Sequence, residues 1–143
     1  MLLDWSNIDT VLLDMDGTLL DLHFDNYFWL THLPTRYAER FNLDPAVVTP
    51  QIHDRLMARR GTLKWYSTDF WSGEFGVDII ALKGEIKHLI TERPQALELL
   101  DTLAKKGKKR LLVTNADRKS IQLKFSQTAI AEHFEQVVSS QDY

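Results

Sequence analysis

The sequence contains no cysteine, which excludes disulfide bonds, thiolate metal sites and a cysteine nucleophile. Any metal must therefore bind to oxygen or imidazole ligands. The sequence also lacks the run of ~20 apolar residues that a membrane-spanning helix requires. Its N-terminus, MLLDWSNID, has neither the basic region nor the long apolar stretch of a signal peptide. We therefore expect a cytoplasmic protein that does not bind membranes.

An excess of charge of one sign is absent as well. The chain has 17 basic and 20 acidic residues, and its net charge of −3 provides no surface for a nucleic-acid backbone. The one basic cluster, residues 105–110, is interrupted by Gly107, and we expect it to be the solvated end of a helix. A chain of 143 residues that is 44% hydrophobic is long enough for one ordinary core. The sequence thus predicts a globular protein with no nucleic-acid partner.

Short apolar runs that end abruptly in polar residues predict an α/β fold. Residues 10–13 and 110–113 are such runs, and both are too short for helices, so we interpret them as buried parallel strands. The helix that connects them is expected to have Pro94 in its first turn and to end near Gly107. Residues 136–139 resemble a third strand of the same sheet.

A long helical insertion separates the first strand from the rest of the predicted sheet. We expect the core to comprise residues 1–20 and 91–143, and the insertion, residues 21–90, to form a small helical bundle. The pattern predicts one helix over 25–41 interrupted at Pro34, a second from Thr49-Pro50 to Gly61, a third over 63–75, and a fourth after Asp78 as N-cap.

Polar residues follow the first two predicted strands at the point where each strand ends. Asp14 and Asp16 follow the first strand, with Gly17 next to them, while Thr114 and Asn115 follow the second. Ligands of open parallel sheets bind beyond the carboxyl ends of the strands, so we expect these side chains to share one site.

This set of residues suits phosphoryl transfer. A carboxylate such as Asp14 can attack phosphorus and form an aspartyl-phosphate, while a second carboxyl, Asp16, can protonate the leaving oxygen and later activate water. Gly17 allows backbone amides to approach the phosphate, and Thr114 and Asn115 can donate hydrogen bonds to its oxygens. Clustered carboxylates and a dianionic substrate together favour Mg²⁺.

The two strand ends resemble the motifs of a known family. The run 11–21, VLLDMDGTLLD, is similar to the first motif of the haloacid dehalogenase superfamily, and Leu111–Asn115 resembles the second. The resemblance implies a Rossmann-like core with an inserted helical cap. It also implies that Asp14 is the nucleophile and a magnesium ligand, that Asp16 is the acid/base with its backbone carbonyl on the metal, and that Thr114 binds phosphate. Asp16 argues against a dehalogenase, because carbon–halogen cleavage needs no acid for the leaving group.

A closer resemblance, to the bacterial GMP/IMP nucleotidase branch, covers nearly the whole chain. It rests on Asp21, on Phe24–Trp29, on Leu63–Tyr66 and on Asp69 with Trp71, and it implies a purine nucleotide substrate. The aromatic residues of the predicted insertion have enough surface to stack a purine base. They are Tyr27, Phe28, Trp29, Trp65, Tyr66, Phe70, Trp71 and Phe75. The alternative is that these rings only pack the helices together.

The family's third and fourth motifs, a lysine and an acidic pair, are expected after Tyr143. Lys119 and Lys124 lie too early and on a helix, so we do not assign the lysine role to them. Two hypotheses follow: the N-terminal part of a phosphatase, or a noncatalytic fragment that binds phosphate weakly or self-associates. We expect the 143-residue chain alone to bind Mg²⁺ poorly and to hydrolyse phosphate esters no faster than background. The first strand would be an exposed sheet edge, through which the chain tends to self-associate.

Overall fold

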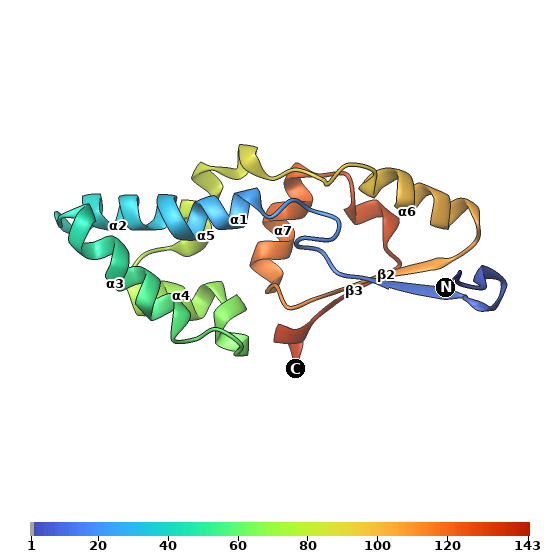
Figure 1. The fold of residues 1–143 in the computed structure, drawn as a ribbon, viewed down its shortest axis with the longest axis horizontal. Coiled ribbons are helices and arrows are strands. Elements are labelled where there is room, and N and C mark those ends of the chain that lie inside the picture. The colour runs from blue at the N-terminus through green and yellow to red at the C-terminus, as the bar shows by residue number, and fades with distance from the viewer. Residues whose placement is uncertain (1) are drawn as a thin grey trace.

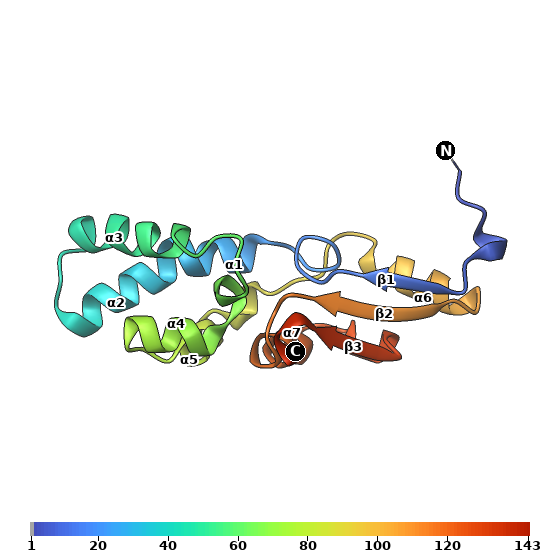
Figure 2. The same ribbon diagram turned by 90° about the horizontal axis from the view of Figure 1, so that it is seen from below.

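A computed structural model describes residues 2–143 as an elongated molecule with a sheet at one end and a group of helices at the other (Figures 1 and 2). The strands are β1 (Thr10–Leu13), β2 (Lys109–Thr114) and β3 (Gln136–Ser139). The helices are α1 (His23–Tyr27), α2 (Leu33–Phe41), α3 (Pro45–Met57), α4 (Thr68–Phe75), α5 (Ile79–Glu85), α6 (Ala96–Lys105) and α7 (Arg118–Gln127). None of these helices is long and apolar enough to cross a membrane.

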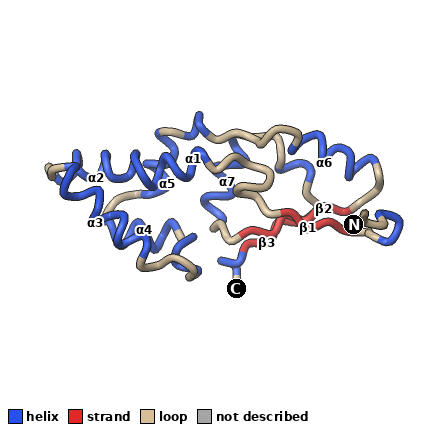
Figure 3. The backbone as a smooth tube through the Cα atoms, in the orientation of Figure 1, coloured by secondary structure: helices blue, strands red, loops and turns tan. Residues whose placement is uncertain are grey.

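The sheet is parallel with the order β1-β2-β3, which confirms the predicted α/β fold. Leu12 pairs with Leu111, and Leu112 pairs with Val137. Figure 3 shows that the strands occupy only one end of the molecule, with α6 and α7 beside them. α6 packs against the sheet through Leu100 and Leu103, which are buried. This arrangement places the carboxyl ends of all three strands at the end of the sheet that faces α1 to α5 (Figure 1).

We refer to residues 21–90, which contain α1 to α5, as the helical segment. Its first two helices and the π-helical turn between them, Phe28–His32, continue through Pro34 without the predicted interruption. Proline has no N–H to bond the carbonyl four residues earlier and its ring needs space there, which a wider π-turn provides. The prediction of a break at Pro34 was therefore wrong, and the proline instead coincides with a change in helical pitch.

Several predicted helix boundaries also differ from those observed. α3 begins at Pro45, because Asp44 caps it by accepting a hydrogen bond from the Ala46 N–H at 2.9 Å, and Pro50 lies inside the helix. The predicted third helix is split at Ser67, which caps α4 through the Phe70 N–H. The predicted cap of α5, Asp78, is confirmed by its bond from the Ala81 N–H at 3.0 Å.

One continuous core joins the sheet to the helical segment. The loop after β1 contributes Met15, Leu19 and Leu20, all at most 1% exposed, and Phe24 of α1 and Leu112 of β2 are equally buried. Apolar burial is the main favourable contribution to folding, so these side chains fix the loop against both parts of the molecule. The polar residues between them are held in place as a consequence.

Candidate active site

The loop after β1 contains two carboxylates, one on each side of the buried Met15. Met15 is fully buried, while Asp14 before it is exposed and Asp16 after it is half-buried. The Asp14 Oδ1 accepts a hydrogen bond from the Met15 N–H at 2.7 Å, which orients the carboxylate and leaves its second oxygen available. The predicted nucleophile is thus accessible and preoriented.

Gly17 gives this loop its shape. Its φ is +78°, a left-handed conformation that favours glycine, and an added Cβ would lie 3.2 Å from the Leu22 side chain. The Gly17 N–H donates to the Leu20 carbonyl at 2.8 Å. Its own amide is therefore occupied within the loop, where Gly17 shapes the turn, and the phosphate contact predicted for Gly17 stays a prediction.

The carboxyl ends of β2 and β3 lie beside the loop that follows β1. Thr114 pairs with Ser139 in register, and both are buried. The Thr114 Oγ1 accepts a hydrogen bond from the Ala116 N–H at 3.1 Å, so the hydroxyl proton remains free to donate. Asn115 is exposed beyond the strand end, and its backbone carbonyl accepts a hydrogen bond from Gln141 Nε2 at 3.4 Å. Asp14, Asp16 and Thr114 therefore lie at the same end of the sheet, and their roles in a shared site stay predictions.

Two buried lysines, absent from the predicted site, are part of it. Lys124 of α7 lies with its Nζ 2.5 Å from Asp16 Oδ1 and 2.5 Å from Asp25 Oδ2. Lys83 of α5 lies 3.2 Å from the other oxygen of Asp25. The side chains of Lys124 and Lys83 are 3% and 5% exposed, so these are buried charges with partners.

A signal for Lys124 was present in the sequence. Ser120, Ile121 and Lys124 have helical spacing on one face of α7, and all three are buried. A lysine in line with Ile121 is therefore inside the molecule, where it needs an anionic partner. No comparable pattern identified Asp25 as that partner, because the contact joins residues 99 positions apart.

Burial and the neighbouring charges shift the pKa values of this cluster in different directions. Burial raises the pKa of the Asp16 carboxyl, and the Lys124 ammonium only partly opposes it. Burial would also raise the pKa of Asp25, but its two lysine partners outweigh that effect and lower it. Burial would lower the pKa of Lys124, whereas the negative charges of Asp25 and Asp16 raise it. Asp25 and Lys124 are therefore charged, and Asp16 is the carboxyl that most readily holds a proton.

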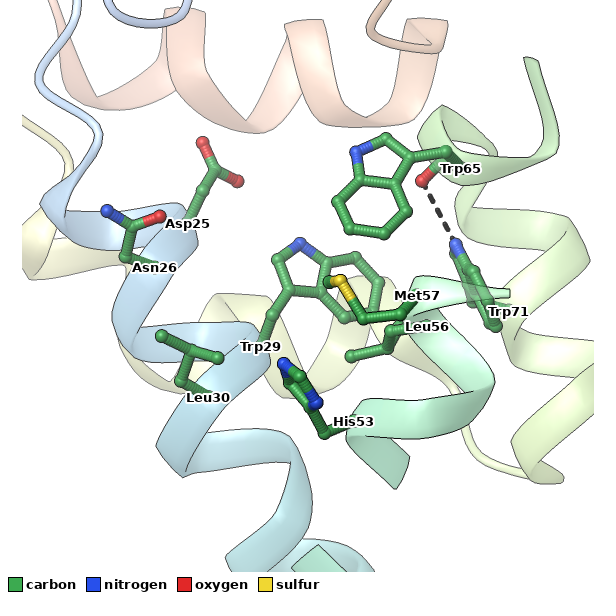
Figure 4. A pocket seen from close by; sticks show the side chains of 9 residues that line it. All are labelled: Asp25, Asn26, Trp29, Leu30, His53, Leu56, Met57, Trp65 and Trp71. Carbon is green, nitrogen blue, oxygen red and sulfur yellow. Dashed lines mark hydrogen bonds between the residues drawn. The ribbon is translucent and has the colours of Figure 1, made fainter. Parts of the chain in front are cut away.

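Two adjoining cavities open from this cluster into the helical segment. One, of about 200 Å³, is lined by Asp16 and Lys124 among others, and the second, of about 150 Å³, is largely apolar (Figure 4). Both are lined by Asp25, Asn26, Trp29 and Trp65. These shared residues lie between Asp16, which lines the first cavity, and the apolar residues of the second, while Asp14 and Thr114 line neither cavity.

The eight aromatic residues named in the sequence analysis differ in burial, and of these Tyr27 and Tyr66 are exposed while Phe70 is half-buried. Phe28, Trp71 and Phe75 are at most 2% exposed and belong to the core. Trp29 and Trp65 are only half-buried, and their rings face the second cavity. The Trp71 Nε1–H donates to the Trp65 backbone carbonyl at 3.0 Å, so the buried Trp71 ring holds the backbone of the half-buried Trp65 (Figure 4).

The predicted metal ligands offer oxygen donors of the type that Mg²⁺ prefers. These are the exposed Asp14 carboxylate and the backbone carbonyl of Asp16, whose side chain is bound to Lys124. Within residues 2–143 no group of three or more histidine, aspartate or glutamate side chains is arranged to hold a metal. The donor type fits Mg²⁺, and these two groups would supply only part of an octahedral shell.

Comparisons with known proteins agree with this geometry. The family model of haloacid dehalogenase-like hydrolases matches residues 8–143. The chain is 35% identical over 139 residues to the GMP/IMP nucleotidase YrfG of Escherichia coli (strain K12), a match that covers 97% of this chain and 63% of the relative. The chain thus spans less than two thirds of the length of this relative.

Solved structures show the same fold. The crystal structure of a HAD phosphatase from Thermococcus onnurineus superposes with a TM-score of 0.81 at 21% identity, covering 94% of this chain and 63% of that one. The L-2-haloacid dehalogenase from Xanthobacter autotrophicus gives a TM-score of 0.53 at 19% identity, covering 94% and 58%. At such identities the similarity establishes the fold and leaves the chemistry to the site.

Proposed function

The chain belongs to the haloacid dehalogenase-like hydrolases, and we propose from this premise that it is a phosphomonoesterase that acts through an aspartyl-phosphate on Asp14. The observation that supports the proposal most directly is that Asp14, Asp16 and Thr114 lie at the carboxyl ends of two paired parallel strands. In this proposal residues 1–20 and 91–143 form the core, and the helical segment is the cap that covers the site.

The proposed reaction uses the two carboxyls in sequence. The free oxygen of Asp14 attacks phosphorus, and the ester oxygen leaves with a proton from Asp16, whose raised pKa suits a proton donor. Asp16 then removes a proton from water, which attacks the acyl-phosphate, releases phosphate and regenerates Asp14. The Thr114 hydroxyl donates to a nonbridging oxygen of the phosphoryl group.

A magnesium ion would be held by the Asp14 carboxylate and the Asp16 carbonyl. When bound, it would reduce the repulsion between the carboxylates and the dianionic substrate. Lys124 already neutralises part of the local negative charge, because its ammonium lies against Asp16. In this proposal Thr114 binds and orients the phosphoryl group, and Asp16 exchanges protons with the ester oxygen and with water.

We propose a purine nucleotide as the substrate. This rests on the 35% identity to a GMP/IMP nucleotidase and on the apolar cavity in which Trp29 and Trp65 expose their rings. Stacking on an aromatic ring stabilises a bound base by about 1–3 kcal/mol. A nucleotide with its phosphate at Asp14 would extend along the shared walls toward these tryptophans.

The substrate class is tested by comparing GMP with p-nitrophenyl phosphate as substrates of the protein expressed from its whole gene. We expect Trp29→Ala and Trp65→Ala to lower kcat/KM for GMP about tenfold and to change it little for p-nitrophenyl phosphate. Phe70→Ala is the control, because Phe70 is half-buried in the same segment but lines neither cavity. Equal losses on both substrates would mean that the rings only support the fold.

A second proposal concerns assembly. β1 is an edge strand of the three-stranded sheet, and Leu12 in its middle is 64% exposed. An apolar edge strand with unpaired backbone groups favours pairing with a second chain. We propose that the 143-residue chain self-associates through β1.

A further inference from the structure

Asp25 occupies the boundary between the catalytic cluster and the tryptophan cavity. It lines both cavities, and Figure 4 shows its carboxylate directed toward α7. Asn26 lies next to it and also lines both. These two polar side chains therefore belong to the wall of the cavity that contains both Asp16 and Trp29.

The acceptor capacity of Asp25 is only partly used. An ionised carboxylate offers about four lone-pair sites. Lys83 binds one oxygen at 3.2 Å and Lys124 binds the other at 2.5 Å, which leaves about two sites free. The Asp25 side chain remains 19% exposed although its lysine partners are 3% and 5% exposed. The lysines thus hold a charged acceptor in place at the cavity wall.

An ion pair that only joins the helical segment to α7 does not need to be buried at a cavity wall. Asp69 is also a carboxylate of the helical segment paired with a lysine of α7, since Lys119 lies 2.5 Å from it. Asp69 is 75% exposed and lines neither of the two cavities. Asp25 therefore differs from Asp69 in its burial, in having two lysine partners and in lining both cavities.

We infer that Asp25 accepts hydrogen bonds from the sugar hydroxyls of a ribonucleotide, with Asn26 beside it, and so selects ribose over deoxyribose. The inference rests on the nucleotide substrate proposed above. With the phosphate at Asp14 and the base at the tryptophans, the sugar lies at the wall that both cavities share. An acidic side chain that binds a ribose hydroxyl is an established way for a protein to recognise this sugar.

The test measures binding by calorimetry of GMP, 2′-deoxy-GMP and 2′,3′-dideoxy-GMP to the protein expressed from its whole gene. The Asp14→Asn background prevents consumption of the nucleotides. A hydrogen bond to a charged group predicts that loss of the hydroxyls weakens binding about tenfold to a hundredfold. Because the unmodified Asp25 is probed with altered ligands, this comparison does not depend on how a variant folds.

Variants then assign the effect to Asp25. Asp25→Asn would leave two buried lysines without a full charge partner, so Asp25→Glu is preferred, because it keeps the charge and moves the oxygens by one methylene. We expect the ratio of the GMP and dideoxy-GMP dissociation constants to approach one in Asp25→Glu and to stay at the wild-type value in Asp69→Glu. Equal binding of the three nucleotides by the Asp14→Asn protein with Asp25 intact overturns the inference alone. Failure to bind any of them overturns the proposed substrate, and the inference with it.

Discussion

Lys124 brings a positive charge into a region that water hardly reaches. Its side chain is 3% exposed, and its two carboxylate partners lie on different parts of the molecule, Asp16 in the loop after β1 and Asp25 in α1. Removing one partner of a buried ion pair costs about 3–5 kcal/mol, because an uncompensated charge remains. Lys124 is therefore important for stability as well as for the arrangement of the site.

We predict that Lys124→Met lowers the free energy of unfolding by about 3 kcal/mol or more. Lys119→Met is the matched control on the same helix, since Lys119 also pairs with an aspartate of the helical segment but is exposed. An exposed pair contributes about 1 kcal/mol at most. Urea denaturation followed by tryptophan fluorescence measures both. Similar losses in the two variants would show that the buried network contributes no more than a surface pair.

The sequence predicted the residues at the strand ends but not the residues that contact them from elsewhere. Asp14, Asp16 and Thr114 could be found because the end of a parallel strand is a local feature with a known position in the fold. Asp25 and Lys83 could not, because their role depends on how two helices of the segment approach α7. Such contacts are a property of packing and leave no local pattern.

At the scale of elements, α7 is the helix through which the sheet contacts the helical segment. Its N-cap, Asp117, accepts from the Ser120 N–H at 2.9 Å, and its other oxygen accepts from the N–H and the hydroxyl of Thr68, both at 2.6 Å. Thr68 is the first residue of α4. One carboxylate thus caps α7 and binds the start of a helix from the other part of the molecule.

This carboxylate should make stability depend on pH. Burial would raise the pKa of Asp117, but the hydrogen bonds from Thr68 and Ser120 outweigh it and lower the pKa below its usual value. The stabilisation is therefore complete above about pH 4, where aspartate in the unfolded chain is ionised, and is lost as the pH falls through the lower pKa of the folded chain.

We predict that Asp117→Asn is less stable than wild type near neutral pH and that the difference shrinks on acidification. Asparagine is an equally good N-cap, so the substitution mainly removes the ionised acceptor. Urea denaturation at a series of pH values down to about pH 3 measures the difference. A difference that stays constant over the series would mean that the ionisation of Asp117 does not contribute.

The elements themselves could be predicted better than their ends. All three strands were confirmed, because short apolar runs with abrupt polar ends have few alternatives. α3 began earlier than expected, since Asp44-Pro45 and Thr49-Pro50 are equally good start signals and only packing distinguishes them. α6 begins at Ala96 and not at Pro94, because Gln95 before it has a left-handed φ of +67°. Helix ends depend on such choices at single residues.

At the scale of the whole molecule, the exposed edge of β1 bears on assembly. Leu12 projects from this strand and is 64% exposed. We predict that Leu12→Lys reduces self-association of the 143-residue chain, because a charge on an edge strand opposes pairing with another edge. Sedimentation velocity at several concentrations measures the effect. An unchanged distribution of species in the variant would exclude β1 as the contact.

The site belongs to neither part of the molecule alone. The sheet edge supplies Asp14, Asp16 and Thr114, while the helical segment supplies Asp25 and the two tryptophans of the apolar cavity. The continuous core and the contacts of α7 hold these parts together. In the proposed function, the residues assigned to the chemistry and those assigned to recognition are thereby separated in the chain but adjacent in space.

The central claim is that Asp14 is the residue that receives the phosphoryl group. It is tested by mixing the protein expressed from its whole gene with GMP and Mg²⁺, quenching in acid after a fraction of a turnover, and locating phosphate by peptide mass spectrometry. The account predicts a phosphate adduct on Asp14 in wild type, and neither adduct nor turnover in Asp14→Asn, because an amide is a poor nucleophile. Turnover that persists in Asp14→Asn, or an adduct on another residue, would contradict it.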